Sequence, residues 1–182
     1  MDTETELKVR LSSTDFQDIR KILRSIGGKT RTANQVENNI LFDYTDNRLQ
    51  KSACALRLRS YNGIFLLTFK GKVQGNTFLK KRSEIQTPVS HFKRMKDLLQ
   101  QIGLHPKFLY SKKREIWVLG KESDTVEISL DQTPFGFFLE IEGREKAILK
   151  ASDLLGINFE DAITESYVTL YRKEGLGSTL ND

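Results

Sequence analysis

The chain begins with Met1-Asp2-Thr3-Glu4-Thr5-Glu6-Leu7-Lys8-Val9-Arg10-Leu11, in which charged and apolar residues alternate. Successive side chains of a β-strand point to opposite faces. The segment therefore predicts a strand with acids and bases on one face and aliphatic residues on the other. A half-buried strand turns its apolar face toward the core. Because the alternation recurs along the chain, we expect a sheet with one apolar and one charged face.

The length and composition are those of one globular domain. The chain has 182 residues, of which 29% are charged and 38% are hydrophobic. This is long enough for a core and too apolar for a disordered chain. We expect a single domain over residues 1–182, with its core at about residues 3–172 and a short C-terminal tail. The net charge of +5 favours an anionic partner.

The composition also limits the metal chemistry and the cell compartment. Cys54 is the one cysteine, so no internal disulfide can form, and with two histidines there is no zinc cluster. A metal would be a hard cation held by carboxylates. No stretch is apolar enough to span a membrane and the N-terminus is acidic rather than signal-like, so we expect a cytoplasmic protein.

Helical and strand patterns follow one another along the rest of the chain. Apolar spacing and caps predict helices at residues 16–26, 92–102, 144–155 and 166–171. Alternating segments predict strands at residues 38–44, 53–61, 63–71, 78–87, 108–118, 125–132 and 137–143. Residues 28–37 are expected to form a loop, residues 48–52 a linker or a helical turn, and Asn62-Gly63 a hairpin turn. These elements indicate an α+β chain of about eight strands.

Acids and bases recur in pairs on the charged strand faces. The pairs are Glu4 and Glu6, Arg57 and Arg59, Arg82 and Glu84, Glu127 and Asp131, and Glu140 and Glu142. Helices must cover the apolar faces, so the charged faces point away from them. In an open sheet these faces meet water. In a closed barrel they line the interior, where carboxylates together with Arg and Lys suit a polyphosphate with divalent cations.

Several short motifs occur in a set order. They are Glu4-Thr5-Glu6-Leu7-Lys8, Leu41-Phe42-Asp43, Ala55-Leu56-Arg57-Leu58-Arg59, Thr68-Phe69-Lys70-Gly71, Arg82-Ser83-Glu84, Asp131 before a turn, Glu140-Ile141-Glu142 and Ser166-Tyr167. With these motifs the chain resembles the CYTH superfamily, the triphosphate tunnel metalloenzymes, over roughly residues 3–172. The resemblance implies a closed eight-stranded antiparallel β-barrel with helices packed on its outside. It also implies a lumen that binds a triphosphate and a divalent metal.

The resemblance further implies roles for individual side chains. The metal, Mg²⁺ or Mn²⁺, would be held by Glu4, Glu6, Asp131, Glu140 and Glu142. The phosphate oxygens would be bound by Lys8, Arg57, Arg59, Lys70, Arg82 and Arg114. The expected catalytic residues are Lys8, Glu4 and Glu6. The roles of Glu84 and Lys173 stay open, and Lys80 and Lys81 are expected to be charges at the mouth of the lumen.

The family includes triphosphatases and class IV adenylate cyclases, whose reactions share most of their machinery. The cyclases resemble one another through a His-x-Gln-x-Asp-x-Tyr-Phe stretch, where this chain has Gln35-Val36-Glu37-Asn38-Asn39-Ile40-Leu41-Phe42 and retains only Phe42. We therefore favour a metal-dependent hydrolase of inorganic tripolyphosphate or of an organic triphosphate such as thiamine triphosphate. The alternative is a cyclase that converts ATP to cyclic AMP and pyrophosphate.

A third alternative is a non-catalytic module that binds polyphosphate or nucleic acid. The paired carboxylates count against it, because without metal they repel phosphate. The expected partner is a small molecule that contains a triphosphate. We expect no membrane contact and nucleic acid only as a 5′-triphosphate end. A homodimer is suggested by analogy alone.

Overall fold

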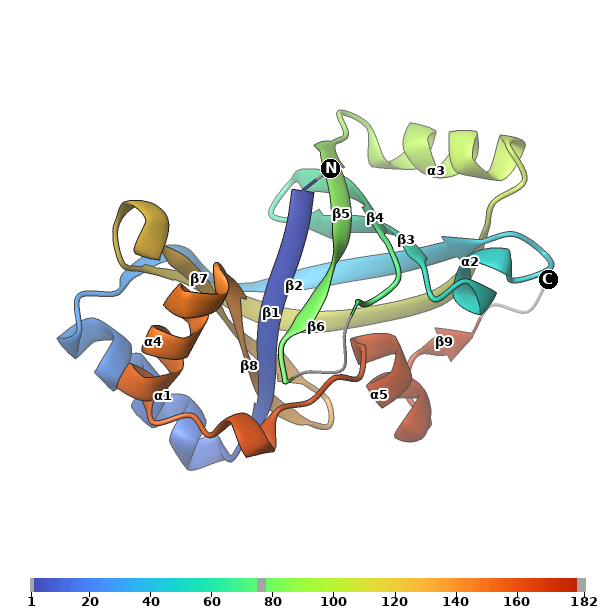
Figure 1. Ribbon diagram of the computed structural model, residues 1–182. Coiled ribbons are helices and arrows are strands. Elements are labelled where there is room, and N and C mark those ends of the chain that lie inside the picture. The colour runs from blue at the N-terminus through green and yellow to red at the C-terminus, as the bar shows by residue number, and fades with distance from the viewer. Residues whose placement is uncertain (1, 75–77, 180–182) are drawn as a thin grey trace.

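Eight strands close into a barrel in the computed structural model, which describes residues 2–74 and 78–179 (Figure 1). They are β1 (Asp2–Leu11), β2 (Lys29–Asp43), β3 (Ala55–Tyr61), β4 (Ile64–Lys70), β5 (Lys80–Pro88), β6 (His105–Leu119), β7 (Val126–Thr133) and β8 (Gly136–Gly143). The strand order is β2-β3-β4-β5-β1-β8-β7-β6, all neighbours are antiparallel, and pairing of β2 with β6 closes the ring. A short β9 (Ser178–Thr179) is added to β6. The expected α+β fold with a closed antiparallel barrel is confirmed.

The helices lie where the sequence predicts them. They are α1 (Ser13–Ser25), α2 (Arg48–Lys51), α3 (Phe92–Gln101), α4 (Glu145–Leu155) and α5 (Tyr167–Lys173), with 3₁₀ turns η1 (Glu122–Asp124) and η2 (Phe159–Asp161). α1 begins at Ser12, which forms a capping box with Asp15. α4 ends at Gly156, whose φ of 66° suits glycine. None of the described helices is long and apolar enough to cross a membrane.

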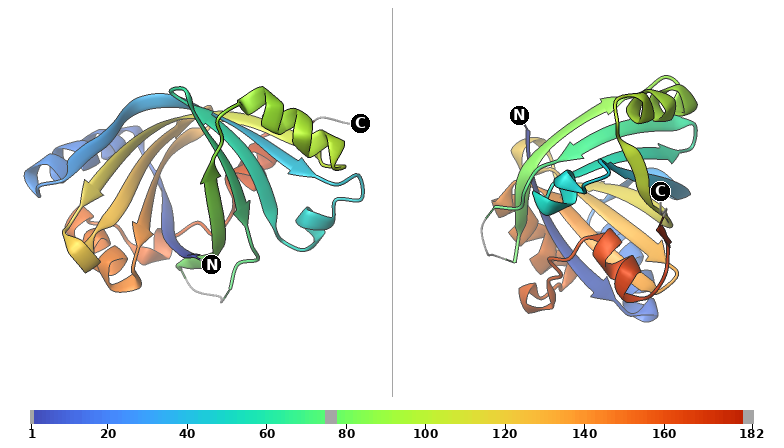
Figure 2. Two further views of the ribbon diagram at one scale, coloured as in Figure 1. Left: turned by 90° about the horizontal axis from the view of Figure 1, so that it is seen from above. Right: turned by 90° about the vertical axis from the view of Figure 1, so that its right-hand side faces the viewer.

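The apolar strand faces are buried under the helices. α1 and α4 cover one side of the barrel, where Leu7, Ile128 and Ile141 are fully buried (Figure 2). α3 covers another side, where Phe42 and Leu58 are buried. Each such side chain contributes about 1.5–3 kcal/mol by leaving water. Because these residues face outward, the charged residues that alternate with them face into the barrel.

The two ends of the barrel differ. α2, α5 and β9 gather at one end, which we call the α5 end and which faces the viewer in the right-hand view of Figure 2. The opposite end, the turn end, carries the turn between β3 and β4. There Asn62 and Gly63 have positive φ values of 46° and 74°, as a two-residue hairpin turn requires. β1 runs from the turn end toward the α5 end, because its Asp2 pairs with Glu84 and its Glu6 with Lys80.

Several strands begin at other residues than predicted, among them β3 at Ala55 rather than 53 and β6 at His105 rather than 108, and β2 differs most. β2 begins at Lys29, so most of the expected loop at residues 28–37 is strand. The side chains here are mostly polar and exposed, without regularly spaced apolar residues, and pairing with β6 through Lys29↔Val118 and Gln35↔Arg114 forms the strand. β5 begins at Lys80 rather than at residue 78.

Candidate active site in the barrel lumen

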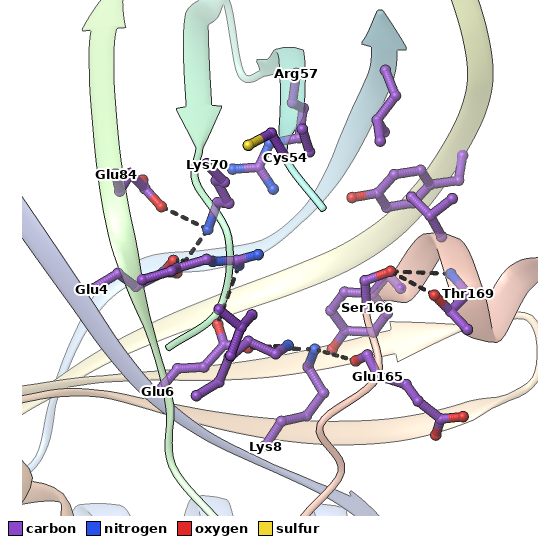
Figure 3. Close-up of a pocket in the computed structure, with 18 of the residues that line it drawn as sticks. Glu4, Glu6, Lys8, Cys54, Arg57, Lys70, Glu84, Glu165, Ser166 and Thr169 are labelled. Atoms are coloured by element: carbon purple, nitrogen blue, oxygen red, sulfur yellow. Dashed lines mark hydrogen bonds and ion pairs between the residues drawn. The ribbon is translucent and has the colours of Figure 1, made fainter. Parts of the chain in front are cut away.

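A cavity of about 620 Å³ lies inside the barrel, and side chains from all eight of its strands line it (Figure 3). All the predicted site residues except Asp131 belong to this lining. Asp131 lies behind it and has no exposed surface. The wall also contains charged residues outside the predicted set, namely Asp43, Lys80, Glu84, Lys107, Lys112, Glu127, Glu165 and Arg172. The structure therefore brings the predicted residues together in one enclosed space.

Glu4 is held between two bases on the neighbouring strands. It is directly opposite Arg82 on β5, whose Nε donates to Glu4 Oε2 at 2.8 Å. Lys70 on β4 lies 2.7 Å from Glu4 Oε1 and 2.7 Å from Glu84 Oε2, as Figure 3 shows. Burial would raise the pKa of Glu4, but Lys70 and Arg82 outweigh it and lower the pKa. Glu4 is therefore ionised, and Glu84 shares its lysine.

Lys8 is a buried positive charge farther along β1. Its Nζ lies 3.1 Å from Glu140 Oε1 and 3.6 Å from Glu6 Oε1, and it donates to the backbone carbonyl of Glu165. Burial alone would lower the pKa of Lys8, but Glu140 and Glu6 outweigh it and raise the pKa. Lys8 therefore remains charged at neutral pH.

Asp131 is surrounded by donors. Lys112 Nζ lies 2.8 Å from its Oδ2, and Arg114 donates through Nε at 2.7 Å and Nη2 at 2.5 Å. The hydroxyl of Tyr167 on α5 donates to Oδ2 at 2.7 Å. Lys112 and Lys8 lie 4.0 Å and 4.4 Å from the centre of the Tyr167 ring. Burial and the charge of Asp131 raise the pKa of Tyr167 well above its usual value, so its hydroxyl stays a donor.

Three acids lie side by side toward the turn end, and we call Glu6, Glu127 and Glu142 the acidic row. Glu142 on β8 is directly opposite Glu6 on β1 and Glu127 on β7. Lys80 holds Glu6 at 3.0 Å and Arg31 holds Glu127 at 2.6 Å. Glu142 forms no ion pair within the described part of the chain. Burial in the wall, followed by neighbouring carboxylates, raises the pKa of Glu142 to about 7.

The acidic row fits a divalent cation by the chemistry of its donors. A carboxylate with a raised pKa and no basic partner is stabilised strongly in its ionised form when a cation binds beside it. Glu142 is exposed to the lumen, whereas the other predicted ligands Glu4 and Glu140 each share two bases. Across residues 2–74 and 78–179, no three acidic, histidine or cysteine side chains are already grouped as ligands. Mg²⁺ is commonly held by one or two carboxylates, with water and substrate phosphates completing its shell.

Arg57 is the predicted phosphate ligand with the fewest protein partners. Its Nε is buried and has no hydrogen-bond partner among the described residues. Figure 3 shows Arg57 above Lys70 in the cavity wall. A buried donor without a partner is costly, and an anion in the lumen would supply that partner.

The sequence prediction missed an acid on β2. Glu37 is 2% exposed and lies 3.2 Å from Arg59 and 3.8 Å from Lys112. Asn39 donates to Glu37 and accepts from Arg59. Burial opposes the ionisation of Glu37, but Lys112 and then Arg59 outweigh it and hold the pKa well below its usual range. The alternation of residues 35, 37 and 39 is the signal, but the predicted strand began only at residue 38.

Whether a basic residue lies inside or outside the barrel depends on which face of its strand it occupies, because alternate residues face opposite sides. Lys80 was expected at the mouth, but it is 5% exposed and paired with Glu6, because it shares the inward face of β5 with Arg82. Lys81 is exposed. The sequence Lys112-Lys113-Arg114 did not show which of these side chains face inward. In the structure Lys112 and Arg114 line the cavity. Lys173 is exposed and pairs with Glu165.

The α5 end of the cavity is less charged than its interior. Its lining includes Leu41, Ala53, Cys54, Val73, Phe108, Tyr110 and Val168, together with the charged residues Asp43, Lys107, Glu165 and Arg172. α2 is held beside it by Asp43, which accepts backbone N–H groups of Tyr44, Leu49 and Gln50. The α5 end of the cavity thus offers some apolar surface, whereas nearly all the side chains farther in are charged.

The comparisons with known proteins agree with this architecture. The family model of the CYTH domain matches residues 2–162. A protein of Methanocaldococcus jannaschii, provisionally named an adenylate cyclase, is 25% identical over 178 residues, which are 92% of this chain and 97% of that protein.

Two solved structures share the fold. A Vibrio parahaemolyticus protein, provisionally described as an adenylate cyclase, aligns with a TM-score of 0.78 at 21% identity over 94% of this chain and 98% of its own. A Hippeastrum protein, provisionally an adenylyl cyclase and described as having a dominant triphosphatase activity, aligns with a TM-score of 0.68 at 17% identity over 96% of each chain.

Proposed function

We propose that this chain, which belongs to the CYTH domain family, is a metal-dependent hydrolase of triphosphate-containing substrates. The observation that carries the proposal is the lumen, where bases that suit phosphate and carboxylates that suit a cation line one cavity. A triphosphate carries several charges, so catalysis consists mainly of neutralising and aligning it. The substrate would be inorganic tripolyphosphate or an organic triphosphate such as thiamine triphosphate.

The phosphate chain would be bound by the bases of the lumen. The proposed ligands are Lys8, Arg57, Arg59, Lys70, Arg82 and Arg114. Arg57 supports this most directly, because its buried Nε has no partner among the described residues. Arginine binds phosphate oxygens in pairs and lysine adds a compact charge. Glu84 would orient Lys70, to which it is already paired.

The carboxylates of the lumen would hold Mg²⁺ or Mn²⁺. We assign this role to Glu142 together with Glu4, Glu6 and Glu140, which lie on adjoining strands. When bound, the cation neutralises phosphate charge and favours ionisation of the attacking water. Asp131 was expected among these ligands. We propose instead that it positions Lys112 and Arg114, because these bases and Tyr167 occupy its oxygens.

Lys8 would stabilise charge in the transition state rather than move a proton. Its pKa is raised, so it is a poor base, and Glu140 and the Glu165 carbonyl hold its ammonium group in place. A preorganised charge of this kind needs no rearrangement as the P–O bond breaks. Glu4 and Glu6 lie on the same strand. They would contribute by holding the cation and by pairing with Lys70 and Lys80 on neighbouring strands.

Adenylate cyclase is the second candidate, because the M. jannaschii relative carries that provisional name. Two observations support our preference for the hydrolase. Glu37 and Asn39 stand at inward positions of β2 where the cyclase stretch has Gln and Asp, and both are bonded to Arg59. The Hippeastrum relative is described as mainly a triphosphatase.

A product analysis tests the proposal. Purified protein with Mg²⁺ or Mn²⁺ is incubated separately with tripolyphosphate, thiamine triphosphate and ATP, beside a Glu4→Gln/Glu6→Gln variant. We expect orthophosphate from tripolyphosphate or thiamine triphosphate, lost in the variant and in EDTA. Cyclic AMP and pyrophosphate from ATP, with tripolyphosphate left intact, would assign the cyclase reaction. Metal-independent binding without turnover would indicate a binding module.

A further inference from the structure

A second, smaller cavity of about 150 Å³ lies toward the turn end of the barrel. Its wall comes from the parts of β2, β3, β4, β5, β6 and β7 nearest that end. Four side chains line both this cavity and the larger one, namely Arg59, Gln86, Arg114 and Glu127. They form the partition between two compartments of one lumen. The smaller compartment is on the side away from α5.

The charge of the small cavity suits an anion. Its lining contains the arginines Arg31, Arg59 and Arg114 and the acids Glu37 and Glu127. Glu37 is buried and already balanced by Arg59 and Lys112. The lining thus has three arginines against two acids, and an anion would share arginines that already have acidic partners, Arg31 with Glu127, Arg59 with Glu37, and Arg114 with Asp131 and Glu140. The volume of the cavity is too small for a triphosphate with an organic group.

Gln35 supplies an acceptor inside this cavity. Its Oε1 is buried and has no hydrogen-bond partner among the described residues. A buried acceptor of this kind is costly unless a donor reaches it. Free orthophosphate carries at least one P–OH group at neutral pH, whereas the inner phosphates of a triphosphate carry none. Gln35 and the arginines together thus match orthophosphate, which both donates and accepts.

Arg31 and Glu127 lie at the outer side of this cavity. The 2.6 Å ion pair joins side chains that are 65% and 33% exposed, so solvent reaches it. Arg31 is an extra residue of β2, because Thr30 pairs with Trp117 and Thr32 with Ile116 on β6. A bulge of this kind redirects a side chain, here across β6 toward β7. An exposed ion pair contributes about 0–1 kcal/mol and opens readily.

We propose that the small cavity is an orthophosphate subsite gated by Arg31 and Glu127, through which the cleaved phosphate leaves at the turn end. The inference rests on the proposed hydrolase. With an organic group at the α5 end, which is less charged than the interior, the terminal phosphate points toward the partition. Hydrolysis transfers the terminal phosphoryl group to water, and the resulting orthophosphate has Arg59 and Arg114 on both sides of that partition.

The test measures phosphate binding without turnover. Inorganic phosphate is titrated into the protein in EDTA by calorimetry, for the wild type, Arg31→Gln, Gln35→Leu and the control Lys150→Gln, whose lysine pairs with Asp124 on the outer surface. We expect at least fivefold weaker binding for the first two variants and wild-type binding for the control. Thermal melting checks that each variant is folded, and Arg31→Gln changes an exposed side chain.

A second titration locates the phosphate. With Mg²⁺ and saturating pyrophosphate, which fills the larger cavity, orthophosphate should still bind the wild type. Displacement of orthophosphate by pyrophosphate, wild-type affinity in both variants, or no orthophosphate binding at all would each overturn the subsite. If the protein hydrolyses triphosphates but these titrations give the contrary results, only the subsite is rejected. If the titrations give the expected results but no triphosphate is hydrolysed, the hydrolase and the exit role are rejected and the subsite is kept.

Discussion

Asp131 and Glu142 lie on neighbouring strands of one lumen, yet their surroundings are opposite. Asp131 is fully buried, and both of its oxygens accept from Lys112, Arg114 or Tyr167. Glu142 is open to the cavity, has acids opposite it on both sides and has a pKa raised to about 7. The first acid is neutralised by the protein, and the second has no basic partner among the described residues.

The contrast shows how one barrel uses charge in two ways. At the Asp131 cluster every acid has a base, so removing one partner leaves a buried charge uncompensated. In the acidic row, like charges are opposed at Glu142, so the protein tolerates a cost that a cation would remove. The residue type is similar at both places. Its level along the strand and the neighbours it meets there decide the role.

Asp131→Asn tests the first side of the comparison and should have the largest effect. The change leaves Lys112 and Arg114 short of a countercharge in the interior. We expect the free energy of unfolding to fall by about 3–5 kcal/mol, measured by urea denaturation. Asp124→Asn, at an exposed ion pair, is the matched control. A loss below about 1 kcal/mol would show that the cluster is not self-neutralised in the way described.

Glu142→Gln tests the other side. If Glu142 helps to hold the cation, this change should lower kcat for triphosphate hydrolysis about 100-fold, because the cation loses a ligand. Unlike Asp131→Asn, it should not destabilise the fold. Glu174→Gln, which alters an exposed acid paired with Arg10, should leave kcat unchanged. Full activity in Glu142→Gln would move the cation site elsewhere.

The pH dependence of stability sharpens the same contrast. The folded pKa of Glu142, about 7, lies above its ordinary value of 4.5. Between these values the folded protein holds a proton that the unfolded chain has lost, so stability falls as the pH rises. In EDTA, the free energy of unfolding of Glu142→Gln should therefore increase relative to that of the wild type as the pH rises from 4.5 to 8. Because Glu142 is exposed, solvent screening limits the gain to about 1 kcal/mol.

Thermal melts of Glu142→Gln and the wild type across this pH range make the comparison. A constant difference would mean that Glu142 titrates normally and is not short of a cation.

The smallest effect is expected outside the barrel. Lys150→Gln breaks an exposed pair with Asp124 at 3.2 Å, which should cost less than about 0.5 kcal/mol in urea denaturation. The same kind of ion pair would then be worth several times more in the lumen than on the surface. A cost as large as that of Asp131→Asn would remove the distinction.

Much of the fold and of the cavity wall could be predicted from alternation in the sequence. On β7, for example, Val126, Ile128 and Leu130 are buried outward while Glu127 and Asp131 turn inward. The family motifs identified most of the charged residues that line the cavity. Periodicity needs apolar residues on one face, so it found β7 but not the polar first half of β2, which backbone pairing forms. Glu37 was missed for that reason.

Contacts between distant segments were beyond the sequence patterns. Tyr167 reaches Asp131 from α5, and nothing local in either segment marks their contact. Lys80 was expected at the mouth together with Lys81, but its pairing with Glu6 on β1 could not be read from the local sequence. Which side chains contact one another therefore depends on how distant segments are arranged in the fold. Which face of a strand points into the barrel could be predicted from the alternation of apolar and charged residues.

The position of β1 in the ring has a consequence for how the chain folds. β1 is synthesised first, but its partners are β5 and β8, the latter ending at Gly143, and the Ile163 N–H donates to the Lys8 carbonyl. The barrel cannot close until most of the chain has left the ribosome, and such distant pairings make folding slow. During that interval β1 is an unpaired edge whose alternating charges discourage aggregation.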